Sequence, residues 1–220
     1  MSRYMQLLGP ALMLVAGLAF GGPAAAQTSP APTAAAPAAS EFDLDRALAD
    51  RVLGKPDAPV TLIEYSSLTC PHCATFHKDT LPKLKTEYID TGKVKLILRD
   101  YPFDQPGARA AMLARCVPEG RYFAFMDLLF ANQDKWARGN FQENLMQNAK
   151  LAGVSGELAT ACMASEPLLK GILTRRMEGE KTFQIESTPT FILNNGAAKI
   201  VGAQSYDEFK RAIDRLLPKS

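Results

Sequence analysis

The residues with the clearest chemistry are two cysteines separated by two positions, in the run Cys70-Pro71-His72-Cys73. If Cys70 opens a helix, the unpaired backbone N–H groups and the helix dipole at that end stabilise its thiolate. Cys73 then lies one turn later on the same face, so the two sulfurs can close a small ring. His72 can donate to the thiolate and lower the pKa of Cys70 further. Because a stabilised thiolate favours the reduced pair, the oxidised pair is predicted to donate its disulfide.

A zinc site is one alternative for a pair of cysteines with this spacing. The other two cysteines, Cys116 and Cys162, stand alone and far apart, and His77 follows Cys73 by one helical turn. Four ligands are therefore difficult to assemble. A purely structural disulfide is a second alternative, but an exposed turn with a histidine between the cysteines is an unusual place for one. We expect thiol–disulfide exchange at Cys70 and Cys73, with no metal and no cofactor.

The elements around this motif are predicted to be a strand, a helix and a second strand. Residues 59–66 are rich in β-branched and apolar side chains, which indicates a buried strand that leads into Cys70. An apolar stripe at helical spacing continues through residues 77–88, and Pro82 is expected to kink this helix without ending it. The second strand is predicted at 94–98. A strand, a helix and a strand in succession require a parallel pair with a right-handed crossover.

The segment from about residue 105 to 183 is predicted to be wholly helical. Within it, Asn140 with Glu143 is typical of a helix N-terminus with a capping box, and Ser165 is expected to begin another helix. This segment separates the first two strands from the remaining ones. We therefore expect it to form an all-helical subdomain inserted into the sheet-containing part of the chain.

The C-terminal part is predicted to form a hairpin and a final helix. Strands are expected at 190–193 and 199–201, joined through the turn Asn195-Gly196. Ser205 and Glu208 have the spacing of a capping box at the start of the last helix. The predicted fold is α/β: a β-α-β unit, the helical insert, and a β-β-α unit around a central sheet.

The N-terminal residues are predicted to lie outside this fold. Residues 1–26 have the layout of a cleavable secretory signal peptide, with Arg3, an apolar stretch and then Ala24-Ala25-Ala26. Residues 27–42 consist mostly of Ala, Pro, Thr and Ser, which is typical of a disordered linker. The folded domain is expected to span 43–220. We expect export to the periplasm.

Composition excludes some classes of protein. With 47% hydrophobic and 22% charged residues, the chain of 220 residues is globular and long enough for a substantial core. Its formal net charge of +2 gives no electrostatic support for a dedicated nucleic-acid-binding protein, which would normally carry a strong basic excess.

The run from Glu64 to Cys73 resembles the active site of the DsbA-like thiol:disulfide oxidoreductases, whose characteristic motif is Cys-Pro-His-Cys. Three further segments are similar to the same family: Arg99–Pro102, Thr188–Phe191 and Gly202–Gln204. The resemblance extends from about residue 43 to the end of the chain. It implies a thioredoxin fold with a helical insertion. It also implies that Cys70 is the attacking cysteine and that Cys73 is the buried partner that resolves the mixed disulfide.

The resemblance assigns roles to three supporting residues. Pro189 is expected to be a cis-proline that faces the cysteines, and Thr188 before it to offer backbone groups to an extended substrate. Glu64 matches a carboxylate beneath the family's active site, where it could accept the proton that leaves Cys73. A surface glutamate on an edge strand is the alternative for Glu64. Threonine before the proline also occurs in disulfide isomerases and reductases, so this position leaves those activities open.

Cys116 and Cys162 both fall in the helical insert. In an exported protein, two remaining cysteines most simply bond to each other. Two free buried thiols and an intermolecular disulfide are the alternatives. Some relatives of the family carry an extra disulfide in this subdomain, which favours the internal Cys116–Cys162 bond.

These observations predict an exported oxidase that donates the Cys70–Cys73 disulfide to reduced, unfolded exported proteins. The family implies reoxidation by a quinone-linked membrane partner of the DsbB type. The first alternative is an isomerase or reductase kept reduced by a partner, which usually requires oligomerisation. Residues 27–42 contain no heptad pattern that would drive assembly, so we expect a monomer. The second alternative is a chaperone-like binding module that retains a redox fold.

Overall fold

The structure is a computed structural model that describes residues 42–219. The predicted signal peptide and residues 27–41 of the predicted linker lie outside the described residues. The described chain begins with a short helix, α1 (Leu44–Leu48), in which the Asp43 side chain accepts the backbone N–H of Arg46.

A mixed sheet of five strands forms the centre of the fold, in the order β1-β3-β2-β4-β5. The strands are β1 (Arg51–Leu53), β2 (Val60–Ser66), β3 (Val94–Asp100), β4 (Thr190–Leu193) and β5 (Ala198–Val201). The parallel pairing of β2 with β3 confirms the predicted crossover, and the antiparallel β4–β5 pair confirms the predicted hairpin. β2 lies between β3 and β4, so the residues at its end are surrounded by other elements.

β1 is an element that the sequence patterns do not predict. It has only three residues, too few to display the alternation by which strands are recognised. Its first residue is a buried arginine, Arg51, whose guanidinium donates to the backbone carbonyl of Arg115 at 2.8 Å. Because Arg51 and Arg115 are far apart in the sequence, no local sequence pattern indicates their contact.

The helix after β2 continues through Pro82, as predicted. It consists of α2 (Pro71–Thr75), a π-helical turn (Phe76–Thr80), α3 (Leu81–Leu84) and a second π-helical turn (Lys85–Ile89). Its apolar side chains pack with those of the last helix, α10 (Tyr206–Leu216), in one cluster that also includes inward-facing residues of the sheet. This layer covers one face of the sheet and fixes the direction in which α2 leaves β2.

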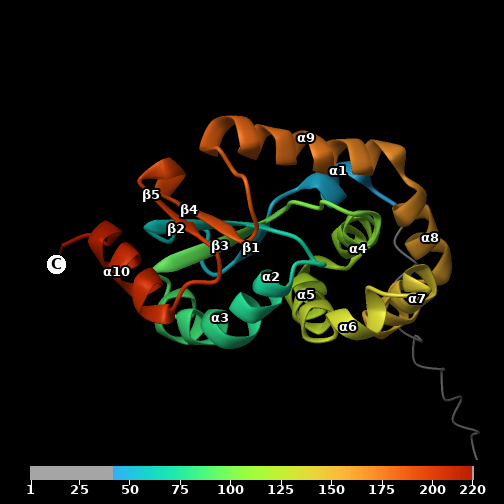
Figure 1. Cartoon of the computed structure of the whole chain (residues 1–220), viewed down its shortest axis with the longest axis horizontal. Coiled ribbons are helices and arrows are strands. Elements are labelled where there is room, and N and C mark those ends of the chain that lie inside the picture. Colours follow the sequence, from blue (N-terminus) through green and yellow to red (C-terminus); the bar gives the residue numbers. More distant parts are fainter. Residues whose placement is uncertain (1–41, 220) are drawn as a thin grey trace, which may run out of the picture. The chain divides into compact units, whose positions relative to one another are not determined.

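Six helices connect β3 to β4, and they form the second part of the fold (Figure 1). They are α4 (Gln105–Cys116), α5 (Tyr122–Ala131), α6 (Gln133–Trp136), α7 (Phe141–Leu151), α8 (Gly156–Ala164) and α9 (Glu166–Phe183). In Figure 1, α9 lies on the side of the sheet opposite α3 and α10. On this side Gly179 is buried directly against the Tyr65 ring, where a larger side chain would collide with it.

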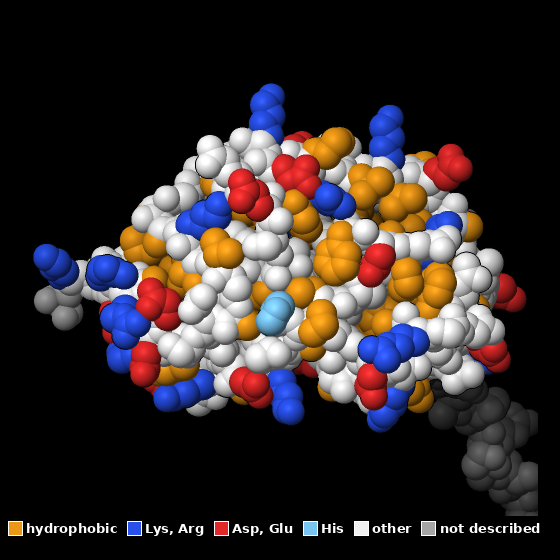
Figure 2. All heavy atoms as spheres, viewed as in Figure 1, with side chains coloured by type: hydrophobic (Ala, Val, Ile, Leu, Met, Phe, Trp, Pro, Cys, Tyr) orange, Lys and Arg blue, Asp and Glu red, His pale blue; other side chains and the backbone are white. Residues whose placement is uncertain are grey.

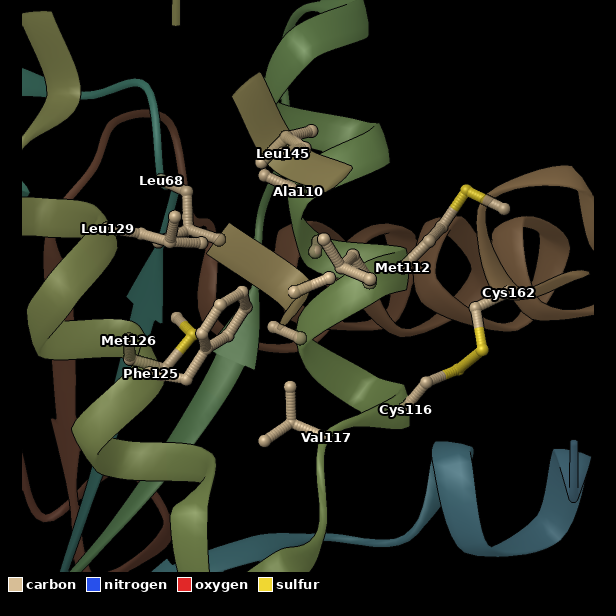
Figure 3. Packing of buried hydrophobic residues seen from close by; sticks show 14 of the residues in the cluster. Leu68, Ala110, Met112, Cys116, Val117, Phe125, Met126, Leu129, Leu145 and Cys162 are labelled. Carbon is tan, nitrogen blue, oxygen red and sulfur yellow. A yellow bond between two sulfur atoms is a disulfide. The ribbon is translucent and has the colours of Figure 1, made fainter. Parts of the chain in front are cut away.

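A second apolar cluster lies mainly among these helices and also contains Leu98 of β3 and the two cysteines Cys70 and Cys73; Figure 3 shows part of it. Met112 and Leu129 are fully buried in it, and Trp136, which is 1% exposed, closes it from α6. A disulfide joins Cys116 at the end of α4 to Cys162 on α8 at the edge of this core. The structure thus contains the predicted Cys116–Cys162 disulfide.

The predicted helix starts had different outcomes. The Ser165 side chain accepts the N–H of Leu168, as expected for an N-cap. Asn140 and Ser205 are the N-caps of α7 and α10, so both predicted helix starts are confirmed. The capping boxes are wrong, because neither side chain accepts a backbone N–H of its helix. Asn140 instead donates to the Glu143 carboxylate, and Glu208 instead binds Arg211. In both cases an acidic side chain has a stronger local partner than the backbone.

Candidate active site

Cys70 lies at the junction where β2 ends and α2 begins. It is the N-cap residue of α2, and Pro71 occupies the first turn. A backbone N–H in this turn would have no partner within the helix, so proline loses no helical hydrogen bond there. The backbone N–H of Cys70 donates to the Ser67 carbonyl at 3.0 Å, which closes the turn that brings the chain out of the sheet. The Cys70 side chain therefore stands at a helix N-terminus, as the sequence predicts.

The surroundings of Cys70 stabilise its thiolate. Hydrogen bonds from the Cys73 thiol, from the Thr188 side chain and from the backbone N–H groups of Cys73 and His72 lower the pKa of Cys70 to about 5, although burial opposes this shift. At neutral pH the reduced protein thus holds Cys70 as an anion. His72 contributes through its backbone, while its ring is exposed.

Cys73 has the opposite character. It is fully buried, and burial, its hydrogen bond to Cys70 and the nearby Glu64 carboxylate all raise the pKa of Cys73. The Ser66 side chain opposes this shift only in part. The pair therefore consists of one anionic sulfur and one protonated sulfur, an arrangement suited to one attacking and one resolving cysteine.

The loop before β4 lies against Cys70. The peptide bond between Thr188 and Pro189 is cis, and the Thr188 carbonyl oxygen is 3.3 Å from the Cys70 sulfur, positioned to accept from its thiol. Pro189 is buried, and its own carbonyl accepts the N–H of Gly202 at 2.8 Å. The structure thus brings Thr188, Pro189 and Cys70 together from positions more than a hundred residues apart.

Glu64 is 0% exposed on the central strand β2, so the alternative of a surface glutamate on an edge strand is wrong. Its Oε2 lies 3.1 Å from Nε2 of His77, and Nδ1 of His77 lies 3.2 Å from Oδ1 of Asp127. From the sequence, His77 is expected only to be part of a helical stripe and is not expected to bind a metal. The available signal is its position four residues after Cys73, which places it on the same helix face.

Gln133 is a second residue whose position is not predicted. Its side-chain amide donates to the carbonyls of Leu68 and Cys70, at 2.7 and 2.9 Å. On the other side of the turn, the Thr69 hydroxyl donates to Asp104, which also caps α4 through the N–H of Gly107. The helical part thus holds the active-site turn at both ends.

Exposed apolar side chains lie on the loop and the helix that are linked to the active-site turn. Figure 2 shows hydrophobic side chains around a histidine on the face in view. Phe103 is 55% exposed in the loop that Asp104 connects to Thr69, and Met177 is 57% exposed on α9. The side chain of Arg176 connects α9 to this loop through the Pro102 carbonyl at 2.5 Å. The loop that binds Thr69 and the helix that binds this loop therefore both carry exposed apolar side chains.

Within residues 42–219, no three His, Cys, Asp or Glu side chains come together in a way that could hold a metal ion. Over the same residues, no helix combines the length and apolar character that a membrane span requires.

Comparisons with known proteins agree with this geometry. A thioredoxin family model matches residues 46–215. A Rickettsia typhi protein that bears the name of a protein-disulfide oxidoreductase is 34% identical over 76% of this chain, and the chain spans 62% of that relative's length. Disulfide bond formation protein D of Bacillus subtilis is 30% identical, with 76% of each chain covered.

Solved structures give the same result. The crystal structure of Wolbachia pipientis α-DsbA1 has a TM-score of 0.70 and 32% identity, covering 76% of this chain and 90% of that one. Oxidised BdbD from Bacillus subtilis has a TM-score of 0.69 and 26% identity, covering 76% of this chain and 92% of that one. The chain belongs to the thioredoxin family and, within it, to the DsbA-like thiol–disulfide oxidoreductases.

Proposed function

We propose that the protein is an exported disulfide oxidase that transfers the Cys70–Cys73 disulfide to reduced client proteins. A client thiolate attacks the Cys70 sulfur, and Cys73 leaves and becomes a thiol. A second client thiolate then attacks the client sulfur of the mixed disulfide, and Cys70 leaves as a thiolate. The client loses two electrons and gains a disulfide, and the Cys70–Cys73 pair gains those two electrons.

The observation that carries the proposal is the unequal pair of sulfurs. Cys70, with its pKa lowered to about 5, is a good leaving group in the second step. Stabilisation of its thiolate also favours the reduced protein, which makes the disulfide oxidising. A reductase would instead need a reduced pair that is unstable enough to give up its electrons.

The exposed apolar side chains on the loop and the helix linked to the active-site turn support clients that are unfolded proteins. Phe103 and Met177 offer apolar contacts that are not specific for one sequence. The cis-proline loop offers Thr188 backbone groups to an extended chain, the mode by which a strand is added to an exposed edge.

We also place the protein in the periplasm, delivered by the predicted signal peptide at residues 1–26. The Cys116–Cys162 disulfide supports an oxidising compartment, because such bonds persist where thiols are not kept reduced. There the reduced Cys70–Cys73 pair needs an electron acceptor, for which a DsbB-like, quinone-linked membrane oxidase is the expected partner.

A disulfide isomerase is the second candidate, and Thr188 before the cis-proline favours it. Two refolding experiments with ribonuclease separate the two functions. An oxidase in its disulfide form restores activity to reduced ribonuclease, and its Cys70→Ala variant does not. Faster recovery of scrambled ribonuclease by the reduced protein, with no oxidation of the reduced substrate, would support the isomerase and contradict the oxidase.

A further inference from the structure

The two oxygens of the buried Glu64 carboxylate have different surroundings. Oε2 faces Nε2 of His77 at 3.1 Å, whereas Oε1 is buried and has no hydrogen-bond partner. Burying a carboxylate oxygen without a hydrogen-bond partner costs free energy. Its presence in a folded protein therefore points to a role, such as proton transfer. Glu64 is close enough to Cys73 for its charge to raise the pKa of that thiol.

His77 is held as a cation between two carboxylates. Nε2 faces Glu64 and Nδ1 faces Asp127 at 3.2 Å, so a ring protonated on both nitrogens donates to both. Burial alone disfavours the charged ring, but Glu64 and Asp127 together raise the pKa of His77 to about 9. The ring also stacks on Phe130, with centroids 4.1 Å apart, and meets the edge of Phe76 at 5.6 Å. Packing thus limits its rotation.

The charged and titratable groups around the Glu64–His77 pair come from several elements. They are Glu64 on β2, Cys73 on α2, Tyr122 and Asp127 on α5, and Lys78 and Lys85, which line the surface hollows beside His77. Burial raises the pKa of Tyr122, which therefore stays neutral. The Asp127 side chain is 61% exposed, whereas that of His77 is 2% exposed. His77 is thus the buried cation that faces Glu64.

The reaction requires a proton acceptor beside Cys73. When the pair is reoxidised, Cys70 is first joined to the oxidant in a mixed disulfide. The Cys73 thiol then gives its proton to Glu64, its thiolate attacks the Cys70 sulfur, and the oxidant's thiolate leaves and takes a proton from water. Glu64 afterwards returns its proton to solvent. This step needs a carboxylate oxygen that has no other hydrogen-bond partner, and Oε1 of Glu64 is such an oxygen.

We infer that His77 is a positioning residue of the redox centre, which holds Oε2 of Glu64 so that Oε1 is free to accept the Cys73 proton. This inference rests on the proposed exchange at Cys70 and Cys73. Asp127 supports it from the surface by holding the other nitrogen of the ring. The ion pair is then part of the chemistry as well as part of the packing.

The test separates the two steps of oxidation by mixing the reduced protein rapidly with oxidised glutathione. The rate of the first step, attack by Cys70, depends on glutathione concentration. The second step, attack by Cys73, is intramolecular and does not. His77→Gln keeps a donor towards Glu64 but removes the charge. We expect it to slow the second step by about 10-fold or more at neutral pH, to shift its pH profile, and to leave the first step unchanged.

Three further variants distinguish chemistry from packing. His77→Lys restores a cation and is expected to recover much of the rate. Phe130→Leu removes the stacking partner without changing any charge, so it should lower thermal stability and leave the pH profile of the second step unchanged. Asp127→Asn alters an exposed side chain, so it should fold normally and slow the second step less than His77→Gln does.

Several results would overturn the inference. The inference is wrong if His77→Gln and Asp127→Asn both show the same pH profile of the second step as the wild-type protein. It is also wrong if Phe130→Leu shows the same shift as His77→Gln, since packing would then explain both. Failure of the wild-type protein to react with glutathione at Cys70 would contradict the proposed function itself, and is therefore distinguishable.

Discussion

The two cysteine pairs are equally buried, yet their surroundings differ in kind. Cys70 is 5% exposed and Cys116 is 6% exposed, while Cys73 and Cys162 are both 0% exposed. Cys70 and Cys73 lie one turn apart at a helix N-terminus, beside the Thr188 loop and the Glu64 carboxylate. All four cysteines belong to one apolar cluster, in which Cys116 and Cys162 join α4 to α8. Solvent exposure therefore does not distinguish the two pairs. We propose that the hydrogen bonds and charges around each sulfur make Cys70 and Cys73 the exchanging pair.

The largest effect is expected from loss of the attacking sulfur. Cys70→Ser should abolish oxidation of reduced ribonuclease, because no other sulfur in the pair can form the mixed disulfide. Cys73→Ala should instead accumulate that mixed disulfide, which mass spectrometry detects. If Cys70→Ser retains exchange activity and Cys116→Ala removes it, the assignment of the two pairs is reversed.

Removal of the other pair should affect stability and leave the chemistry intact. The Cys116–Cys162 bond closes a loop with a sequence separation of 46. On the chain-entropy model, its loss lowers the free energy of unfolding by about 4 kcal/mol. The double variant Cys116→Ala/Cys162→Ala is therefore expected to unfold at lower urea concentration while it still oxidises reduced ribonuclease. A folded double variant without oxidase activity would contradict the separation of roles.

The stability of the reduced protein should depend on pH through Cys70. Its pKa is lowered from 9.0 to about 5 on folding, so its contribution to stability is fully present above pH 9 and is lost as the pH falls through 5. The oxidised protein has no Cys70 thiolate. The stability of the reduced form relative to the oxidised form should thus decrease by about 2 kcal/mol between neutral pH and pH 5. Urea unfolding of both forms measures this difference, and an unchanged difference would exclude a buried thiolate.

The smallest effect is expected from Gln133, which connects the helical part to the active-site turn. Gln133→Leu removes the amide that donates to Leu68 and Cys70, at a cost of about 1 kcal/mol in the free energy of unfolding. Gln142→Leu, at an exposed position on α7, is the matched control and should change stability less. Hydrogen exchange of the turn around Cys70 should increase in the first variant only. Equal exchange in both would mean that α6 does not hold the turn.

The strand that leads into Cys70 and the helix that follows it could be predicted because their signals are local. The run 59–66 has a strand composition, and the motif itself marks the start of a helix. The roles of His77 and Gln133 could not be predicted, because they depend on contacts across the fold. His77 meets Glu64 over 13 positions and Asp127 over 50, and Gln133 reaches Cys70 over 63. The capping boxes failed for a related reason, since a local pattern cannot show which partner a carboxylate prefers.

The central claim is that charge and hydrogen bonding around Cys70 make this pair the reactive one. The most direct test is a titration of the thiolate ultraviolet absorbance of the reduced protein, with the oxidised protein as the blank. We predict one transition at a pH of about 5, which belongs to Cys70, and no thiolate from Cys73 up to pH 9. A single transition near the ordinary value of 9.0 would contradict the account.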